Sequence, residues 1–184
     1  MNPQSQEDGV LPPGETDANV LYIAVGRAIH AWEGMEESLA RIFAKMTGLP
    51  ENPYALSDYG SENRRFVDRI SAIKQAAHAY FIRNPDQALE GELDSILTAA
   101  IDLSIKRHRI AHGHISMWGH AKIPDTKGYF EVDMDIRFRW AAPFYSMTNL
   151  RTDPIGTNAA SIDAVHDAFQ NLNRRSAAFI GQMK

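Results

Sequence analysis

Hydrophobic residues recur at intervals of three and four along most of this 184-residue chain, and that period limits the folds open to it. Such intervals put apolar side chains on one face of a helix, where they can be buried together. Capping and stop residues bound the periodic stretches: Asp17 and Gly48 flank the first, and Gly113 ends the third. The sequence therefore predicts long helices over about 17–47, 61–84 and 85–113, and a last helix from about Asn158 or Ser161 to Gln182.

One segment has a different period. Over residues 130–140, apolar side chains alternate with charged ones, which is typical of a strand with one buried face. Residues 115–123 are its expected partner, and the intervening sequence PDTKG is a typical turn. We therefore expect a β-hairpin over about 115–140.

The second and third predicted helices meet at Asn84 and Pro85, which stop one helix and are expected to start the next as N-cap and first-turn proline. So short a turn favours antiparallel packing of the two helices. The expected fold is mainly α: an antiparallel bundle of four principal helices, with the β-hairpin inserted before the last helix.

The chain is long enough for one domain with a buried core, and 44% of its residues are hydrophobic. Residues 1–16 are polar and rich in proline and glycine, with no periodic apolar residues. We expect these residues to form a flexible N-terminal arm, followed by a single helical domain over 17–184.

The net charge of −4 and the isoelectric point near 6.0 argue against a surface generally coated for nucleic-acid binding, so any polynucleotide would be met by a local basic patch. The chain contains no cysteine, which excludes disulfides and thiolate metal sites. It has neither a secretory leader pattern nor a long apolar run. These features predict a soluble, cytoplasmic protein with no membrane partner.

The third predicted helix ends in a cluster of cations and histidines: Lys106, Arg107, His108, Arg109 and His112. At about 100° per residue, Arg107 falls near the middle of the apolar stripe of its helix. A guanidinium keeps its charge, so in that position it needs a carboxylate, a phosphate or water. The end of this helix is therefore the best candidate for a functional site.

Glu36 is a matching anion on the first predicted helix. It lies in the centre of the apolar stripe there, whereas Glu33 and Glu37 point away from it. Buried charges are normally paired. We therefore expect a structural ion pair between Glu36 and Arg107, in which the carboxylate could orient the arginine without excluding a substrate.

The six residues from Arg107 to His112 resemble the signature of the HEPN superfamily: an arginine, a polar residue (Asn, His or Lys), three variable residues and a histidine, late in a helix of an all-α bundle. The context is similar, because two long predicted helices precede these residues and another follows. The resemblance implies a metal-independent endoribonuclease or RNA-processing protein, a class that includes toxins of toxin–antitoxin pairs. The β-hairpin departs from a minimal HEPN bundle and could line or block the cleft.

By this resemblance His112 is the general base or acid, Arg107 holds the phosphate, and His108 or Arg109 assists; Lys106 and Arg109 are expected to contact RNA. The chemistry suits the residue types, since histidine titrates near working pH and arginine forms a bidentate fork on phosphate. The product would carry a 2′,3′-cyclic phosphate. Residues 107 and 112 point about 140° apart on a straight helix, so a homodimer that supplies two copies is expected.

Two alternatives remain open from the sequence. Some HEPN members are inactive binding or adaptor modules, in which case the partner would be another protein, such as an antitoxin. Histidines 108 and 112 also have the spacing of zinc-binding helices, with His114 and His120 nearby, but the H-E-x-x-H pattern is absent and a third ligand cannot be named. We predict no metal and no cofactor.

Overall fold

A computed structural model describes residues 14–49, 59, 65–122, 133–141 and 157–183. Within these residues the chain forms four long helices and one two-stranded antiparallel sheet, which comes before the last helix. The predicted mainly helical fold class and the position of the hairpin are confirmed. In chain order the elements are α1 (Ala18–Thr47), α3 (Phe66–Arg83), α4 (Gln87–His112), β1 (His114–Lys122), β2 (Asp133–Ala141) and α5 (Ala159–Gln182).

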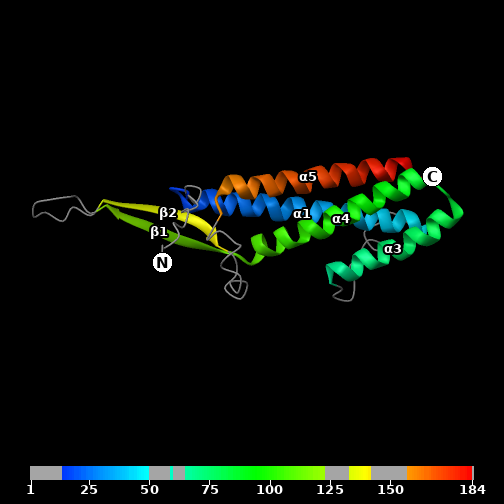
Figure 1. Ribbon diagram of the computed structural model, residues 1–184, viewed down its shortest axis with the longest axis horizontal. Coiled ribbons are helices and arrows are strands. Elements are labelled where there is room, and N and C mark those ends of the chain that lie inside the picture. Colours follow the sequence, from blue (N-terminus) through cyan, green and yellow to red (C-terminus); the bar gives the residue numbers. More distant parts are fainter. Residues whose placement is uncertain (1–13, 50–58, 60–64, 123–132, 142–156, 184) are drawn as a thin grey trace, which may run out of the picture.

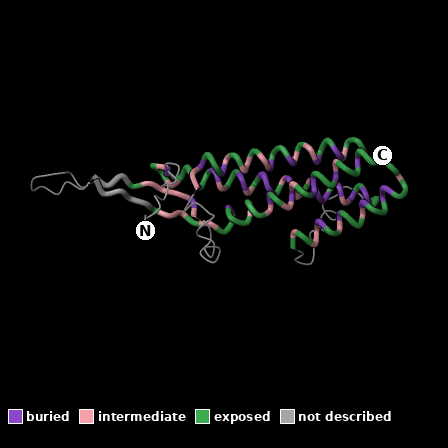
Figure 2. Tube along the Cα trace, in the orientation of Figure 1, coloured by how far each residue is buried: buried purple, intermediate pink, exposed green. Residues whose placement is uncertain are grey.

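The helices form an elongated body from which the hairpin projects at one end (Figure 1). Helices α1 and α5 lie side by side along the long axis, α4 contacts both, and α3 packs against α1 and α4. Buried residues gather on the faces that these helices turn toward one another, while exposed residues cover the outer faces (Figure 2). In the described part of the chain, no helix is both long and apolar enough to cross a membrane.

Helix α1 begins and ends where the sequence predicts. The Asp17 carboxylate accepts a hydrogen bond from the backbone N–H of Asn19, and Gly48 ends the helix in the left-handed conformation at φ 71°. One face of α1 supplies much of the common core. Its buried side chains include Leu21, Trp32, Met35, Leu39, Ile42 and Met46.

The turn between α3 and α4 differs from the prediction in its capping residues. Asn84 ends α3, and its backbone N–H donates to the carbonyl of Tyr80. Helix α4 is capped by Asp86, whose carboxylate accepts from the backbone N–H of Leu89 at 3.0 Å. Asn84 is therefore not the N-cap of α4, because it already closes the preceding helix.

In the hairpin, strand β1 pairs with β2 from His114 opposite Ala141 to Lys122 opposite Asp133. The predicted pairing is confirmed over these residues, while the turn lies outside the described residues. The backbone of Glu15 also pairs with Phe138 of β2, and its carboxylate accepts from the first N–H of α5. Residues 14 and 15 are thus held against the fold, which corrects the end of the predicted arm; residues 1–13 lie outside the described residues.

Gly113 joins α4 to β1, and the reason for glycine is the close approach of another chain segment. Its φ of −73° is open to any residue. A Cβ atom there would lie 2.7 Å from the carbonyl oxygen of Ala141 and would overlap the indole of Trp140. Glycine at this position therefore lets the hairpin fold back beside the end of α4, where the candidate residues lie.

Candidate functional site

A cleft of about 510 Å³ opens between α1, α3 and α4, near the last turns of α4. The size suits a small organic group or a short piece of a polymer. Its walls combine aromatic rings with several charged side chains. The lining residues are Trp32, Glu36, Phe66, Arg69, Ser104, Ile105, Arg107, His108 and Arg109.

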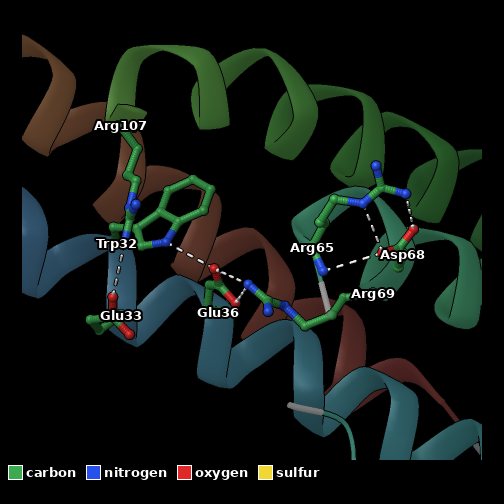
Figure 3. Close-up of polar contacts among 7 residues, drawn as sticks. All are labelled: Trp32, Glu33, Glu36, Arg65, Asp68, Arg69 and Arg107. Atoms are coloured by element: carbon green, nitrogen blue, oxygen red, sulfur yellow. Dashed lines mark hydrogen bonds and ion pairs between the residues drawn. The ribbon is translucent and has the colours of Figure 1, made fainter. Parts of the chain in front are cut away.

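Glu36 lies in this cleft, but it does not pair with Arg107. Its carboxylate forms an ion pair with Arg69 of α3, at 2.7 Å to each oxygen, and both side chains are only 18% exposed (Figure 3). The predicted Glu36–Arg107 pair is therefore wrong. The prediction placed both charges on the inner faces of their helices, which the cleft confirms, but sequence periodicity does not give the register between two helices.

Trp32 fills the space between the two arginines. Its indole N–H donates to Glu36 at 2.9 Å, and its ring packs on Phe66 and Phe169 with centroid distances of 5.1 and 5.3 Å. The side chain is 2% exposed. Buried contacts on several sides fix this indole, and its one polar atom is satisfied by the carboxylate.

Arg107 reaches down from α4 onto the face of Trp32, with its guanidinium carbon 5.9 Å from the ring centroid (Figure 3). Its ion pair is with Glu33 at 3.9 Å, where the glutamate side chain is 63% exposed and the arginine 34%. The buried Nε of Arg107 has no hydrogen-bond acceptor among the residues that the structure describes. This cation is weakly compensated and open to the cleft, so it can accept an anion.

The two candidate histidines contact each other one turn apart. The rings of His108 and His112 lie 4.6 Å apart at an angle of 51°, and both residues are exposed. His108 lines the cleft together with Arg107 and Arg109, whereas His112 is not among the lining residues. His108 thus connects the arginine to His112. Lys106 is exposed and also lies outside the lining.

Tyr59 is a buried residue near the Glu36–Arg69 pair that the sequence did not single out. Burial raises the pKa of its phenol well above the ordinary value, the Glu36 charge raises it further, and Arg69 opposes the shift. Its hydroxyl has no hydrogen-bond partner among the described residues. Periodicity could not find Tyr59, because it lies between the first two predicted helices, where no periodic apolar pattern indicates which residues are buried.

Metal binding was a weaker alternative. Among the described side chains, no three histidine, aspartate or glutamate residues come together in an arrangement that could hold a metal ion. The side chain of His120 lies outside the part of the chain whose side chains the structure describes.

Comparisons with protein-family models, curated proteins and solved structures gave no match. The residues of the cleft offer a cation open to an anion, an imidazole that lines the same cleft, and a second imidazole in contact with the first. Such a set can bind a phosphodiester and move protons near it.

Proposed function

We propose that this protein is a HEPN-like helical bundle that cleaves RNA in the cytoplasm without a metal ion. The observation that supports the proposal is that Arg107 and His108 line the same cleft and that the ring of His108 contacts the ring of His112. The likeness of these residues to the HEPN signature supports the same activity.

Arg107 is the proposed phosphate ligand. Its guanidinium rests on Trp32 and has only a long, exposed contact to Glu33, so an arriving phosphate need not displace a strong partner. A guanidinium can donate two parallel hydrogen bonds to phosphate oxygens, and these bonds strengthen as charge grows on phosphorus. Arg107 therefore stabilises the transition state of phosphoryl transfer, with Arg109 and Lys106 contacting the flanking backbone.

The two histidines are the proposed acid and base. One imidazole takes the proton from the ribose 2′-hydroxyl as the 2′-oxygen bonds to phosphorus. The other gives a proton to the 5′-oxygen as the bond from phosphorus to that oxygen breaks. The products are a 2′,3′-cyclic phosphate and a 5′-hydroxyl.

A homodimer is part of the proposal. His112 lies outside the lining of the cleft that Arg107 enters, so a second copy that supplied its own His112 would complete the site. Ile105 supports an interface here, since it lines the cleft and is 56% exposed. The same separation of His112 from the cleft favours the second candidate function, a module that binds RNA or a protein partner such as an antitoxin without cutting.

The test is RNA cleavage in EDTA by the wild-type protein and three single variants. We expect His112→Ala and His108→Ala each to reduce the cleavage rate by about a hundredfold or more, because each removes a proton-transfer group. His78→Ala is the matched control, since His78 is an exposed histidine of α3 outside the cleft lining. Equal cleavage by all four proteins, or cleavage only with added metal, would overturn the proposal.

A further inference from the structure

Glu36 and Arg107 both contact the indole of Trp32 in the cleft, but they do not pair with each other. Glu36 accepts the hydrogen bond from the edge of Trp32, while Arg107 lies over its face. Figure 3 shows why they stay apart: Arg69 approaches Glu36 from the side away from Arg107 and takes both carboxylate oxygens. Among the described residues that line the cleft, the carboxylate of Glu36 is therefore paired with Arg69 and not with Arg107.

We infer that Arg69 is a positioning residue that holds Glu36 and thereby keeps Arg107 available for an anionic ligand. A carboxylate that is 18% exposed needs a cation, and Arg69 satisfies it at 2.7 Å. Without Arg69, Glu36 would retain the indole N–H as its described donor, and Arg107 would be the cation facing it across that ring. The pairing expected from the sequence would then form and close the site.

The inference rests on the proposed function in one respect, the identity of the ligand as RNA phosphate. Glu36 and a phosphate would compete for the same guanidinium, so the loss of Arg69 weakens anion binding even though Arg69 need not touch the ligand. Removing Glu36 as well removes the competitor. If the ion pair were only structural, the double variant would bind the anion no better than Arg69→Gln, because removing a second charge would not repair the packing of the cleft.

Four variants test whether Glu36 competes with the ligand for Arg107. Arg69→Gln breaks the pair, Glu36→Gln removes the anion, and the double variant removes both charges. Arg41→Gln is the matched control, because Arg41 pairs with Glu37 at 2.6 Å on the solvent side of α1, the helix that carries Glu36. Thermal melting of each protein identifies any variant that is unfolded, and Arg69→Met replaces Arg69→Gln in that event, since it removes the charge and keeps an unbranched side chain against Phe66.

The first measurement is the Arg107 Nε–Hε resonance in arginine side-chain NMR spectra of the free protein, assigned by its loss in Arg107→Lys. In the wild type this N–H has no acceptor among the described residues. We expect its proton to shift downfield in Arg69→Gln as Glu36 pairs with the guanidinium, and to return in the double variant. An unchanged resonance in Arg69→Gln overturns the inference, whether or not the protein cleaves RNA.

The second measurement is fluorescence anisotropy with a fluorescein-labelled, 2′-O-methylated RNA oligonucleotide, which lacks the attacking hydroxyl. We expect Arg69→Gln to bind about tenfold more weakly, as for the loss of one charge-assisted contact. Glu36→Gln should bind about threefold more tightly, because a like charge has left the cleft. The double variant should regain wild-type affinity to within about twofold.

The two readouts separate this inference from the proposed function. A wild-type protein that fails to bind the oligonucleotide contradicts the RNA proposal, and the NMR resonance still decides the role of Arg69. A double variant that binds no better than Arg69→Gln overturns the inference, even if the wild-type protein is a nuclease. Equal affinity in Arg69→Gln and Arg41→Gln has the same meaning.

Discussion

Helix α1 carries two glutamates one turn apart, and each meets an arginine from another helix in a different way. Glu36 and Arg69 are both 18% exposed and lie 2.7 Å apart. Glu33 and Arg107 are 63% and 34% exposed and lie 3.9 Å apart. The first contact has the burial and distance of a structural ion pair, whereas the second leaves its arginine mostly uncompensated.

The difference shows how neighbouring arginines can take separate roles. Arg69 lies against Phe66 and uses its charge to neutralise a carboxylate in the wall of the cleft. Arg107 rests on the indole that this carboxylate holds, and its charge faces the opening. The contacts of Arg69 indicate a role in stability, whereas the proposed function gives Arg107 the role of binding the ligand. The following predictions test that division.

The largest expected effect is on activity. Arg107→Gln should lower the rate of RNA cleavage by about a hundredfold or more, because it removes the cation that stabilises charge on phosphorus. Its melting temperature should change little, since the contact to Glu33 is long and exposed. Cleavage is followed on a labelled RNA, with Arg41→Gln as the control. A large loss of stability in Arg107→Gln would contradict the division of roles.

The buried pair should dominate stability. Glu36→Ala removes the carboxylate that accepts from Arg69 and from the Trp32 indole N–H, and should lower the free energy of unfolding by about 3 kcal/mol. Urea denaturation measures the change. Glu37→Ala is the control, because Glu37 lies on the solvent side of α1 and should change stability by less than about 0.5 kcal/mol. Similar values for the two variants would remove the structural role of the pair.

Tyr59, which is buried near the Glu36–Arg69 pair, should make the stability of the protein depend on pH. The pKa of the Tyr59 phenol is raised in the folded protein. The stabilisation from this buried, neutral phenol is therefore complete below the ordinary pKa of about 10 and is lost as the pH rises beyond that value. Each pH unit above that value should cost up to about 1.4 kcal/mol. Urea denaturation between about pH 9 and 11 should show a shallower alkaline loss for Tyr59→Phe. Parallel curves for the two proteins would contradict the assignment.

The smallest expected effect concerns the open pair. Glu33→Gln should change the free energy of unfolding by less than about 0.5 kcal/mol, because an exposed pair at this distance contributes little. The same denaturation measurement checks it. A loss as large as that of Glu36→Ala would show that the two contacts are equivalent.

Much of the fold was accessible from the sequence because the signals are local. The apolar period placed α1 within about one residue and the start of α5 within about two or three, and the alternation over 130–140 placed β2, which the structure describes over 133–141. The turn at Asn84 was found, but the cap of α4 was not, since Asp86 and Asn84 are both good capping residues and only the fold decides between them.

The candidate site was predicted only in part. Periodicity correctly put Glu36 and Arg107 on inward faces, because facing is a property of a single helix. Which of the inward charges form a pair depends on the axial position of one helix relative to the other. The sequence pattern of a single helix does not contain that information. Arg69 was therefore missed, although its place three residues after Phe66 on the same face was a usable signal.

The most direct test of the central claim is the mass of the 5′ fragment that remains after a defined RNA is incubated with the protein in EDTA. Attack by the ribose 2′-hydroxyl, aided by His108, His112 and Arg107, predicts a fragment ending in a 2′,3′-cyclic phosphate, and its loss in His112→Ala. Intact RNA, or a 5′ fragment ending in a 3′-hydroxyl, would contradict the account.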